Sequence, residues 1–197
     1  MGVMNFRDEE YPDNILKDMR EYVELTDRQL ISDKPHFIKE FIDFENGNKI
    51  NRKKFELSFG GFNTYHRSNN KKPEIGANNE IKGVYVLAEL VGDSPTILNV
   101  GISQTILRRF YQHTCGKKHN QSTFGFYMAL HKHKEQGKIH IGKREAFPYD
   151  DYRDDCLNTI RNLRFAIVPI ENNFELYMAE IYLACHYKAH WNTFETH

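Results

Sequence analysis

The chain has 197 residues, with 27 basic and 27 acidic side chains and a formal net charge of zero at neutral pH. Hydrophobic residues make up 40% and aromatic residues 13%, which excludes a disordered composition and allows a folded core. No apolar run approaches the roughly 20 residues that cross a bilayer, and the acidic N-terminus lacks the apolar core of a secretory signal. Three scattered cysteines argue against a disulfide framework. We expect a cytoplasmic protein with no membrane contact.

Basic and acidic residues are distributed unevenly along the sequence, although the net charge is zero. Residues 1–50 hold 7 basic and 12 acidic side chains, and residues 51–82 hold 7 basic and 3 acidic. Residues 101–145 hold 9 basic and 2 acidic side chains, together with five of the ten histidines. The last block fits an electrostatic footprint for phosphate, and it fits a solvated helix surface equally well.

The N-terminal part reads as helix in pieces over residues 12–44. Apolar residues recur there at helical spacing: Ile15, Leu16, Met19, Val23, Phe37, Phe41 and Phe44. Residues 45–49 predict a turn, and residues 55–80 are rich in Gly, Asn and Pro, which predicts a loop with a short strand at Phe55–Phe59. We place a domain boundary near residue 80. Residues 1–80 then form an extension, helical and afterwards loop-rich, and residues 81–197 form the second domain.

The second domain has a sharper pattern. Residues 83–91 and 97–102 are β-branched and apolar and are joined by a short polar turn, which predicts an antiparallel hairpin. Ser103 suits the N-cap of a helix over residues 104–114. On that helix Thr105, Arg109 and His113 recur every fourth residue and predict a polar stripe.

The remaining elements complete an α/β arrangement. We predict a helix over residues 124–136, a loop over the acidic residues 149–155, a strand over 163–170 and a helix over 175–189 that follows an Asn-Asn cap. The expected fold is a small antiparallel three-stranded sheet flanked by helices.

Glu180 stands out on the last helix. Its neighbours on the helical wheel are apolar: Leu176, Leu183, Ala184 and Tyr187. A carboxylate in such surroundings needs a cation, a metal ion or a proton. One interpretation places it at the rim of the helix, paired with Arg or Lys, and the other makes it a metal ligand.

The second domain also resembles a known family. Gly83-Val84-Tyr85 and Asn99-Val100-Gly101 resemble the GIY and YIG elements of the GIY-YIG nuclease superfamily, which lie on neighbouring strands of a hairpin. Arg109 follows Gly101 by eight residues, and His113 follows four residues later, as in many members of that family. Glu180 and Asn192 keep the spacing of the family's glutamate and asparagine.

The resemblance implies a metal-dependent endonuclease that hydrolyses phosphodiester bonds in DNA, with RNA a less favoured substrate. Glu180 would bind Mg²⁺ or Mn²⁺, and Arg109 would stabilise charge on the phosphate. Tyr85 or His113 would act on the attacking water, and Asn192 would tie the last helix to the sheet. Gly83, Asn99 and Gly101 would be structural members of the motif.

One departure concerns the second family tyrosine, which is replaced here by Asn99. Asparagine cannot ionise and cannot act as a base. A restriction endonuclease is the favoured interpretation, with the N-terminal extension serving target recognition or forming a homodimer. The alternatives are a structure-specific repair nuclease and a catalytically impaired module that only binds DNA or RNA.

Basic residues of the 101–145 block are the expected contacts to nucleic acid, because cations on phosphate supply most of the non-specific affinity. They are Arg108, Lys117, Lys118, Lys132, Lys134, Lys143 and Arg144. The same block invites a zinc hypothesis. Its candidate ligands, whose spacing fits no zinc-finger pattern, are His113, Cys115, His119, His131 and His133.

Overall fold

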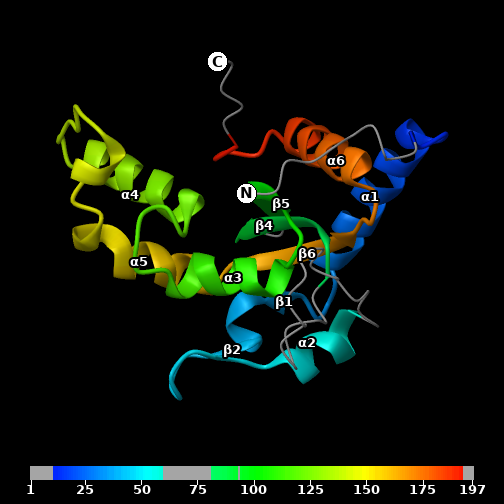
Figure 1. Cartoon of the computed structure of the whole chain (residues 1–197), viewed down its shortest axis with the longest axis horizontal. Coiled ribbons are helices and arrows are strands. Elements are labelled where there is room, and N and C mark those ends of the chain that lie inside the picture. The colour runs from blue at the N-terminus through cyan, green and yellow to red at the C-terminus, as the bar shows by residue number, and fades with distance from the viewer. Residues whose placement is uncertain (1–10, 60–80, 93, 193–197) are drawn as a thin grey trace, which may run out of the picture. The chain divides into compact units, whose positions relative to one another are not determined.

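The computed structural model describes residues 11–59, 81–92 and 94–192. These residues form six α-helices, two 3₁₀-helices and six β-strands. In chain order they are α1 (Ile15–Leu30), β1 (His36–Phe37), η2 (Ile38–Glu40), β2 (Ile42–Asp43), β3 (Lys49–Ile50), α2 (Arg52–Phe59), β4 (Gly83–Val91), β5 (Ser94–Ser103), α3 (Ile106–Cys115), α4 (Thr123–Glu135), η3 (Arg144–Ala146), α5 (Asp150–Arg161), β6 (Arg164–Pro169) and α6 (Asn173–His186) (Figure 1). The α/β class expected from the sequence is confirmed.

The chain divides into two compact units that interleave along the sequence. The sheet unit takes the described parts of residues 1–36, 59–106 and 164–197, and the helical unit takes residues 37–58 and 107–163. The boundary expected near residue 80 lies outside the described residues. None of the helices in the ranges that the structure describes is long and apolar enough to span a membrane.

The main sheet has four strands in the order β1-β6-β4-β5, and a second sheet pairs β2 with β3. β4 is antiparallel to both of its neighbours, β5 and β6. The three strands expected from residues 83–91, 97–102 and 163–170 are all present. The expected number of strands in the sheet was wrong, because the short strand β1 adds a fourth next to β6.

Helices α1 and α6 contact each other and pack on the sheet within the sheet unit (Figure 1). Alternate residues of β4, Val84, Val86 and Ala88, belong to the same buried cluster as Met19 of α1 and Leu183 of α6. The period of two is that of a strand whose alternate side chains face the core. The N-terminal helix is thus part of the core that supports the hairpin.

Polar contacts also join the two helices. The Tyr22 hydroxyl donates to Glu175 Oε1 at 2.5 Å, and the Tyr187 hydroxyl donates to Asp27 Oδ1 at 2.8 Å. Burial and the carboxylate partner raise the pKa of each tyrosine, so both phenols keep the proton they donate. Each of the two contacts therefore pairs a phenol with a carboxylate across α1 and the α6 segment, with Asp27 the acidic partner from α1 and Glu175 the acidic partner from α6.

Phenylalanines provide much of the buried core of the helical unit. The rings of Phe41 and Phe55 meet edge to face at 5.2 Å, and Phe55 meets Phe110 of α3 at 6.5 Å. Helices α4 and α5 pack against each other, and Phe126 of α4 meets Phe147 at 5.3 Å. These edge-to-face pairs are the geometry that aromatic quadrupoles favour.

Three local predictions were wrong. Residues 36–44 form β1, η2 and β2 instead of a helix, and Phe55–Phe59 is helical instead of a strand. Asn51 begins that helix by accepting a hydrogen bond from the Lys54 amide at 3.0 Å. The acidic loop expected at residues 149–155 is the first half of α5.

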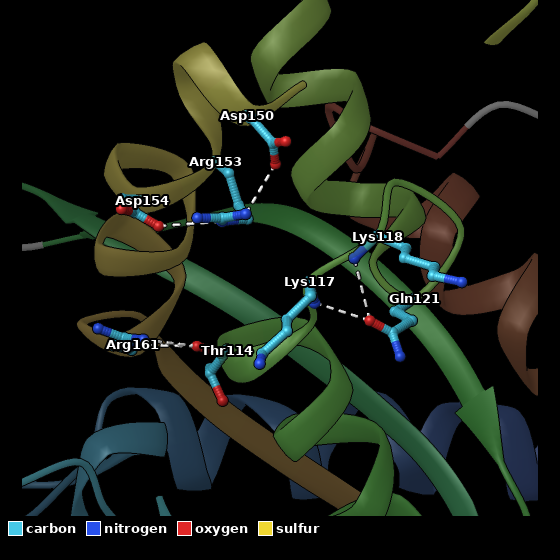
Figure 2. A network of polar contacts seen from close by, with 8 residues as sticks. All are labelled: Thr114, Lys117, Lys118, Gln121, Asp150, Arg153, Asp154 and Arg161. Atoms are coloured by element: carbon cyan, nitrogen blue, oxygen red, sulfur yellow. Dashed lines mark hydrogen bonds and ion pairs between the residues drawn. The ribbon is translucent and has the colours of Figure 1, made fainter. Parts of the chain in front are cut away.

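Helix α5 forms because its acidic residues are placed favourably. Asp150 and Asp151 occupy the first turn, where the helix dipole favours negative charge. Arg153 then pairs with Asp150 at 2.7 Å and with Asp154 at 3.0 Å (Figure 2). Apolar residues at helical spacing provide the buried face: Tyr152, Cys156, Leu157 and Ile160.

Gln29 of α1 completes the hydrogen bonding of β6. Its side-chain amide donates to the Ile167 carbonyl at 2.8 Å, and its side-chain oxygen accepts from the Ile167 amide at 2.9 Å. A side chain thus replaces the partner strand at this position.

We expect Gln29→Ala to lower the free energy of unfolding by about 1–3 kcal/mol, because the buried polar groups of Ile167 lose both partners. Urea denaturation measures the change, and Glu24→Ala on the exposed face of the same helix is the matched control. An equal, small effect of both substitutions would show that Gln29 does not support the strand.

Candidate functional site

The two tripeptides that carry the family resemblance are paired in the β4–β5 hairpin. Tyr85 lies opposite Gly101, Gly83 lies opposite Ser103, and Asn99 lies opposite Leu87. The hairpin expected from the sequence is therefore confirmed, and its register brings Tyr85 against the glycine of the second tripeptide. A register irregularity follows at Leu87 and Ala88.

Both motif glycines lie where a side chain would not fit. A Cβ on Gly101 would overlap the phenol oxygen of Tyr85, and a Cβ on Gly83 would overlap the carbonyl oxygen of Val168 on β6. The Tyr85 side chain lies across the Gly101 backbone, and Tyr85 is only 2% exposed. Glycine is thus required at these positions by close approach of neighbouring groups.

Asn192 holds the segment after α6 against β5. Its Oδ1 accepts from the Val100 amide at 2.7 Å, and its Nδ2 donates to the Val100 carbonyl at 2.7 Å. Asn99 Nδ2 reaches the same Oδ1 at 3.4 Å, and the Trp191 amide donates to the Leu98 carbonyl at 2.8 Å. The tie to the sheet that we expected of Asn192 is present, and it is centred on the second tripeptide.

Glu180 lies on α6, whose N-cap Asn172 accepts from the Glu175 amide at 3.0 Å. Leu176 and Leu183 are buried, as the helical wheel suggested, whereas Ile181 is exposed. Glu180 itself is half-buried, so it stands at the edge of the buried face.

Arg109 belongs to the helical unit and lies on α3. Its Nη1 donates to Gln112 Oε1 and to the Gln121 carbonyl, each at 3.3 Å. The side chain is half-buried. Gln112 of the same helix and Gln121 of the loop after α3 therefore orient the guanidinium.

His113, one turn further along α3, is 1% exposed. The last member of the polar stripe expected on this helix is therefore buried. Its Nδ1 lies 3.0 Å from Ser122 Oγ, the N-cap hydroxyl of α4. Burial, and secondarily the charge of Arg109, hold the pKa of His113 well below its usual value, which keeps the ring neutral at neutral pH.

The loop between α3 and α4 displays two lysines on a fixed backbone. Gln121 Oε1 accepts from the Lys117 amide at 2.7 Å and from the Lys118 amide at 3.0 Å, as Figure 2 shows. Lys117, Lys118, Arg108 and Lys143 are all exposed. These four expected nucleic-acid contacts have cationic groups in solvent, where phosphate could reach them.

Arg144 and Lys132 are engaged with other groups of the helical unit. Arg144 Nη2 donates to the His119 carbonyl at 2.5 Å, and its guanidinium lies 4.1 Å over the Phe126 ring. Burial lowers the Arg144 pKa from its ordinary value. Lys132 pairs with Asp155. The structure thus gives both side chains partners within the fold.

Arg161, which the sequence did not single out, holds the end of α3. Its Nε and Nη2 donate to the Thr114 carbonyl at 3.1 and 2.8 Å (Figure 2), and the guanidinium lies 4.3 Å over the Phe44 ring. Carbonyls in the last turn of a helix lack intrahelical partners, and a cation there also opposes the helix dipole. Arg161 therefore supports the helix that carries Arg109.

The predicted site residues fall into two groups, each formed within one unit. Tyr85, Asn99, Gly101 and Asn192 meet in the sheet unit, and Arg109 and His113 share α3 in the helical unit. Among the described residues no three His, Cys, Asp or Glu side chains gather as a metal-binding group, so the five zinc candidates do not form one.

Comparisons of the chain with protein-family models, curated proteins and solved structures found no match.

We expect Gly101→Ala to destabilise the hairpin by about 1–3 kcal/mol, the usual cost of overpacking a core. Tyr85→Phe in the same background should recover part of the loss, because the phenol oxygen is the atom nearest the new Cβ. Urea denaturation gives both values, with Thr96→Ala on the exposed part of β5 as the control. A neutral Gly101→Ala would contradict the close contact.

His113 should make stability depend on pH. Because its folded pKa is depressed, the unfolded chain binds this proton at a higher pH than the folded chain. The contribution is complete above about pH 6.5 and is lost as the pH falls below that value. His113→Gln should flatten the stability profile between about pH 6.5 and 5 relative to the unmodified chain. Parallel profiles would mean that His113 is not buried in its neutral form.

Proposed function

We propose that the chain is a metal-dependent endonuclease that hydrolyses phosphodiester bonds in DNA. The observation that carries the proposal is the register of the hairpin, in which the Tyr85 ring lies across Gly101 while Asn192 bonds the backbone of Val100. This is the pairing that resemblance to the GIY-YIG superfamily requires of the two tripeptides.

The chemistry of Glu180, a single carboxylate, fits a magnesium ion better than a zinc ion. Its half-buried carboxylate supplies a hard oxygen ligand on a regular helix. Mg²⁺ binds through one or two carboxylates and keeps several waters, whereas zinc needs three or four protein ligands. Bound Mg²⁺ or Mn²⁺ supplies Lewis acidity to the scissile phosphate.

The basic side chains have the chemistry that the reaction needs. A water oxygen attacks phosphorus, one P–O bond breaks, and the water proton passes by way of a base to the leaving oxygen. Arg109, oriented by Gln112 and the Gln121 carbonyl, stabilises charge that develops on the phosphoryl oxygens. Arg108, Lys117, Lys118 and Lys143 hold the flanking backbone phosphates.

Tyr85 and His113 are the two base candidates. His113 has a neutral ring, but burial holds its pKa well below the usual value, so it can accept a proton at neutral pH only if substrate binding raises that pKa. Both side chains are buried, so base catalysis needs one of them to be uncovered when the substrate binds.

The second candidate function is a module that binds nucleic acid without cutting it. The observation that favours it is Asn99, which takes the position of the second family tyrosine and contacts Asn192. A plasmid-nicking assay with Mg²⁺ and then with EDTA separates the two functions. Discrete ends on a defined DNA would support a restriction endonuclease, and scattered nicks would support a structure-specific repair enzyme.

We expect Glu180→Gln and Arg109→Ala each to reduce Mg²⁺-dependent cleavage by roughly 10²–10³-fold or more, as loss of one charge-stabilising group does elsewhere. Cleavage rates on plasmid DNA under single-turnover conditions measure the effect.

The matched controls are Glu24→Gln and Arg28→Ala, two exposed residues of α1. They should cut at the unmodified rate, and all four variants should unfold at similar urea concentrations. Cleavage by either site variant at the unmodified rate would overturn the assignment of that residue.

A further inference from the structure

The segment from residue 138 to residue 143, which we name the 138–143 turn, projects two isoleucines from the helical unit. It follows α4, which ends in a Schellman motif: the Gly137 amide donates to the Lys134 carbonyl and the Lys138 amide to the His133 carbonyl. Gly137 has φ +74°, the left-handed conformation that this cap uses. The chain therefore leaves the helix in a defined direction.

Two polar side chains attach the turn to the helical unit. Lys138 Nζ donates to Gln136 Oε1 at 2.9 Å and lies 5.9 Å over the Tyr152 ring. His140 Nε2 lies 3.1 Å from the Lys143 carbonyl, and its ring meets the buried Phe147 at 5.2 Å. These contacts make the turn an anchored feature of the surface.

The alternating isoleucines point the other way. Ile139 is 81% exposed and Ile141 is 91% exposed, the highest values among the large hydrophobic side chains of the described residues. A histidine that packs on a buried ring, between two isoleucines that face solvent, reverses the pattern of an ordinary surface segment. Burial of these two apolar side chains by a binding partner would therefore be favourable.

The charge around the turn points to a polyanion. Residues 131–144 contain five basic side chains and one acidic side chain, and two of the five basic ones, Lys132 and Arg144, have partners within the helical unit. Lys134 and Lys143 are exposed on either side of the isoleucines. A second copy of the same surface would be repelled by this charge.

Two exposed isoleucines form a small apolar surface, and this small size favours one kind of anionic partner over the others. Two side chains are far short of the roughly 1,000 Å² that a stable protein interface buries. Membrane-surface elements present a whole apolar helix face, which this turn lacks. Proteins that unstack duplex DNA insert one or two aliphatic side chains between base pairs, with cations on the adjacent phosphates.

We propose that Ile139 and Ile141 form a wedge that enters between base pairs of duplex DNA. This inference rests on the proposed function for its substrate, DNA, but it requires no cleavage. Lys134 and Lys143 contact phosphates beside the wedge, and the anchored Lys138 and His140 keep it rigid.

The test uses the full chain on relaxed closed-circular plasmid in EDTA, with a metal-independent topoisomerase present. Insertion unwinds the duplex, so the unmodified chain should shift the topoisomer distribution after protein removal. Ile139→Ser with Ile141→Ser should abolish the shift and weaken plasmid binding roughly tenfold. Ile139→Leu with Ile141→Leu should keep both, and Ile31→Ser, at an exposed isoleucine of the sheet unit (62%), should change neither.

A topoisomer shift that survives the double serine substitution, or plasmid binding without any shift, would overturn the wedge. Binding to vesicles of anionic lipid that the serine substitutions remove, without effect on DNA, would identify a membrane contact instead. Dimerisation that they remove would identify a contact between copies. Failure of the proposed function is separate: a chain that unwinds plasmid but never cuts it with Mg²⁺ keeps the wedge and loses the nuclease.

Discussion

The contact between the Tyr85 ring and the Gly101 backbone is the constraint on which the sheet unit depends. It brings the two tripeptides together, and it exists only because Gly101 lacks a Cβ. Once that register is set, Val84 and Val86 face α1 and α6, and Tyr85 faces the opposite side. A slip of one residue would exchange these faces, so one glycine helps define both the core and the candidate site.

Side-chain amides complete the sheet where strands are missing. Gln29 bonds both backbone groups of Ile167, and Asn192 does the same for Val100. Each satisfies a buried donor and acceptor that would otherwise cost free energy. Because Gln29 comes from the first helix and Asn192 follows the last, segments near both ends of the described chain are fixed to the main sheet, at the inner strand β6 and at the edge strand β5. The second amide also holds the tripeptide on which the proposed chemistry depends.

In the helical unit, buried polar contacts and exposed cations have separate roles. Arg161 and the buried pair His113 and Ser122 fix α3 and the start of α4, while Lys117 and Lys118 stay in solvent. A rigid basic surface of this kind loses little conformational freedom when phosphate binds. The 138–143 turn is similar: its backbone is held by contacts within the helical unit, and its two isoleucine side chains are exposed to a partner. In this unit the exposed side chains would contact the partner, and the buried contacts would hold the backbone that carries them.

The sequence alone determined the α/β class, the hairpin and the helices α1, α3, α4 and α6, because these depend on local periodicity and short motifs. Tertiary structure decided the rest. Only packing shows that His113 is buried and neutral, that Arg144 is stacked on Phe126, and that α1 belongs to the core of the sheet. The acidic start of α5 was misread as a loop because its carboxylates hid a buried apolar face that a neighbouring helix stabilises. Burial depends on residues distant in the sequence, and no local pattern records them.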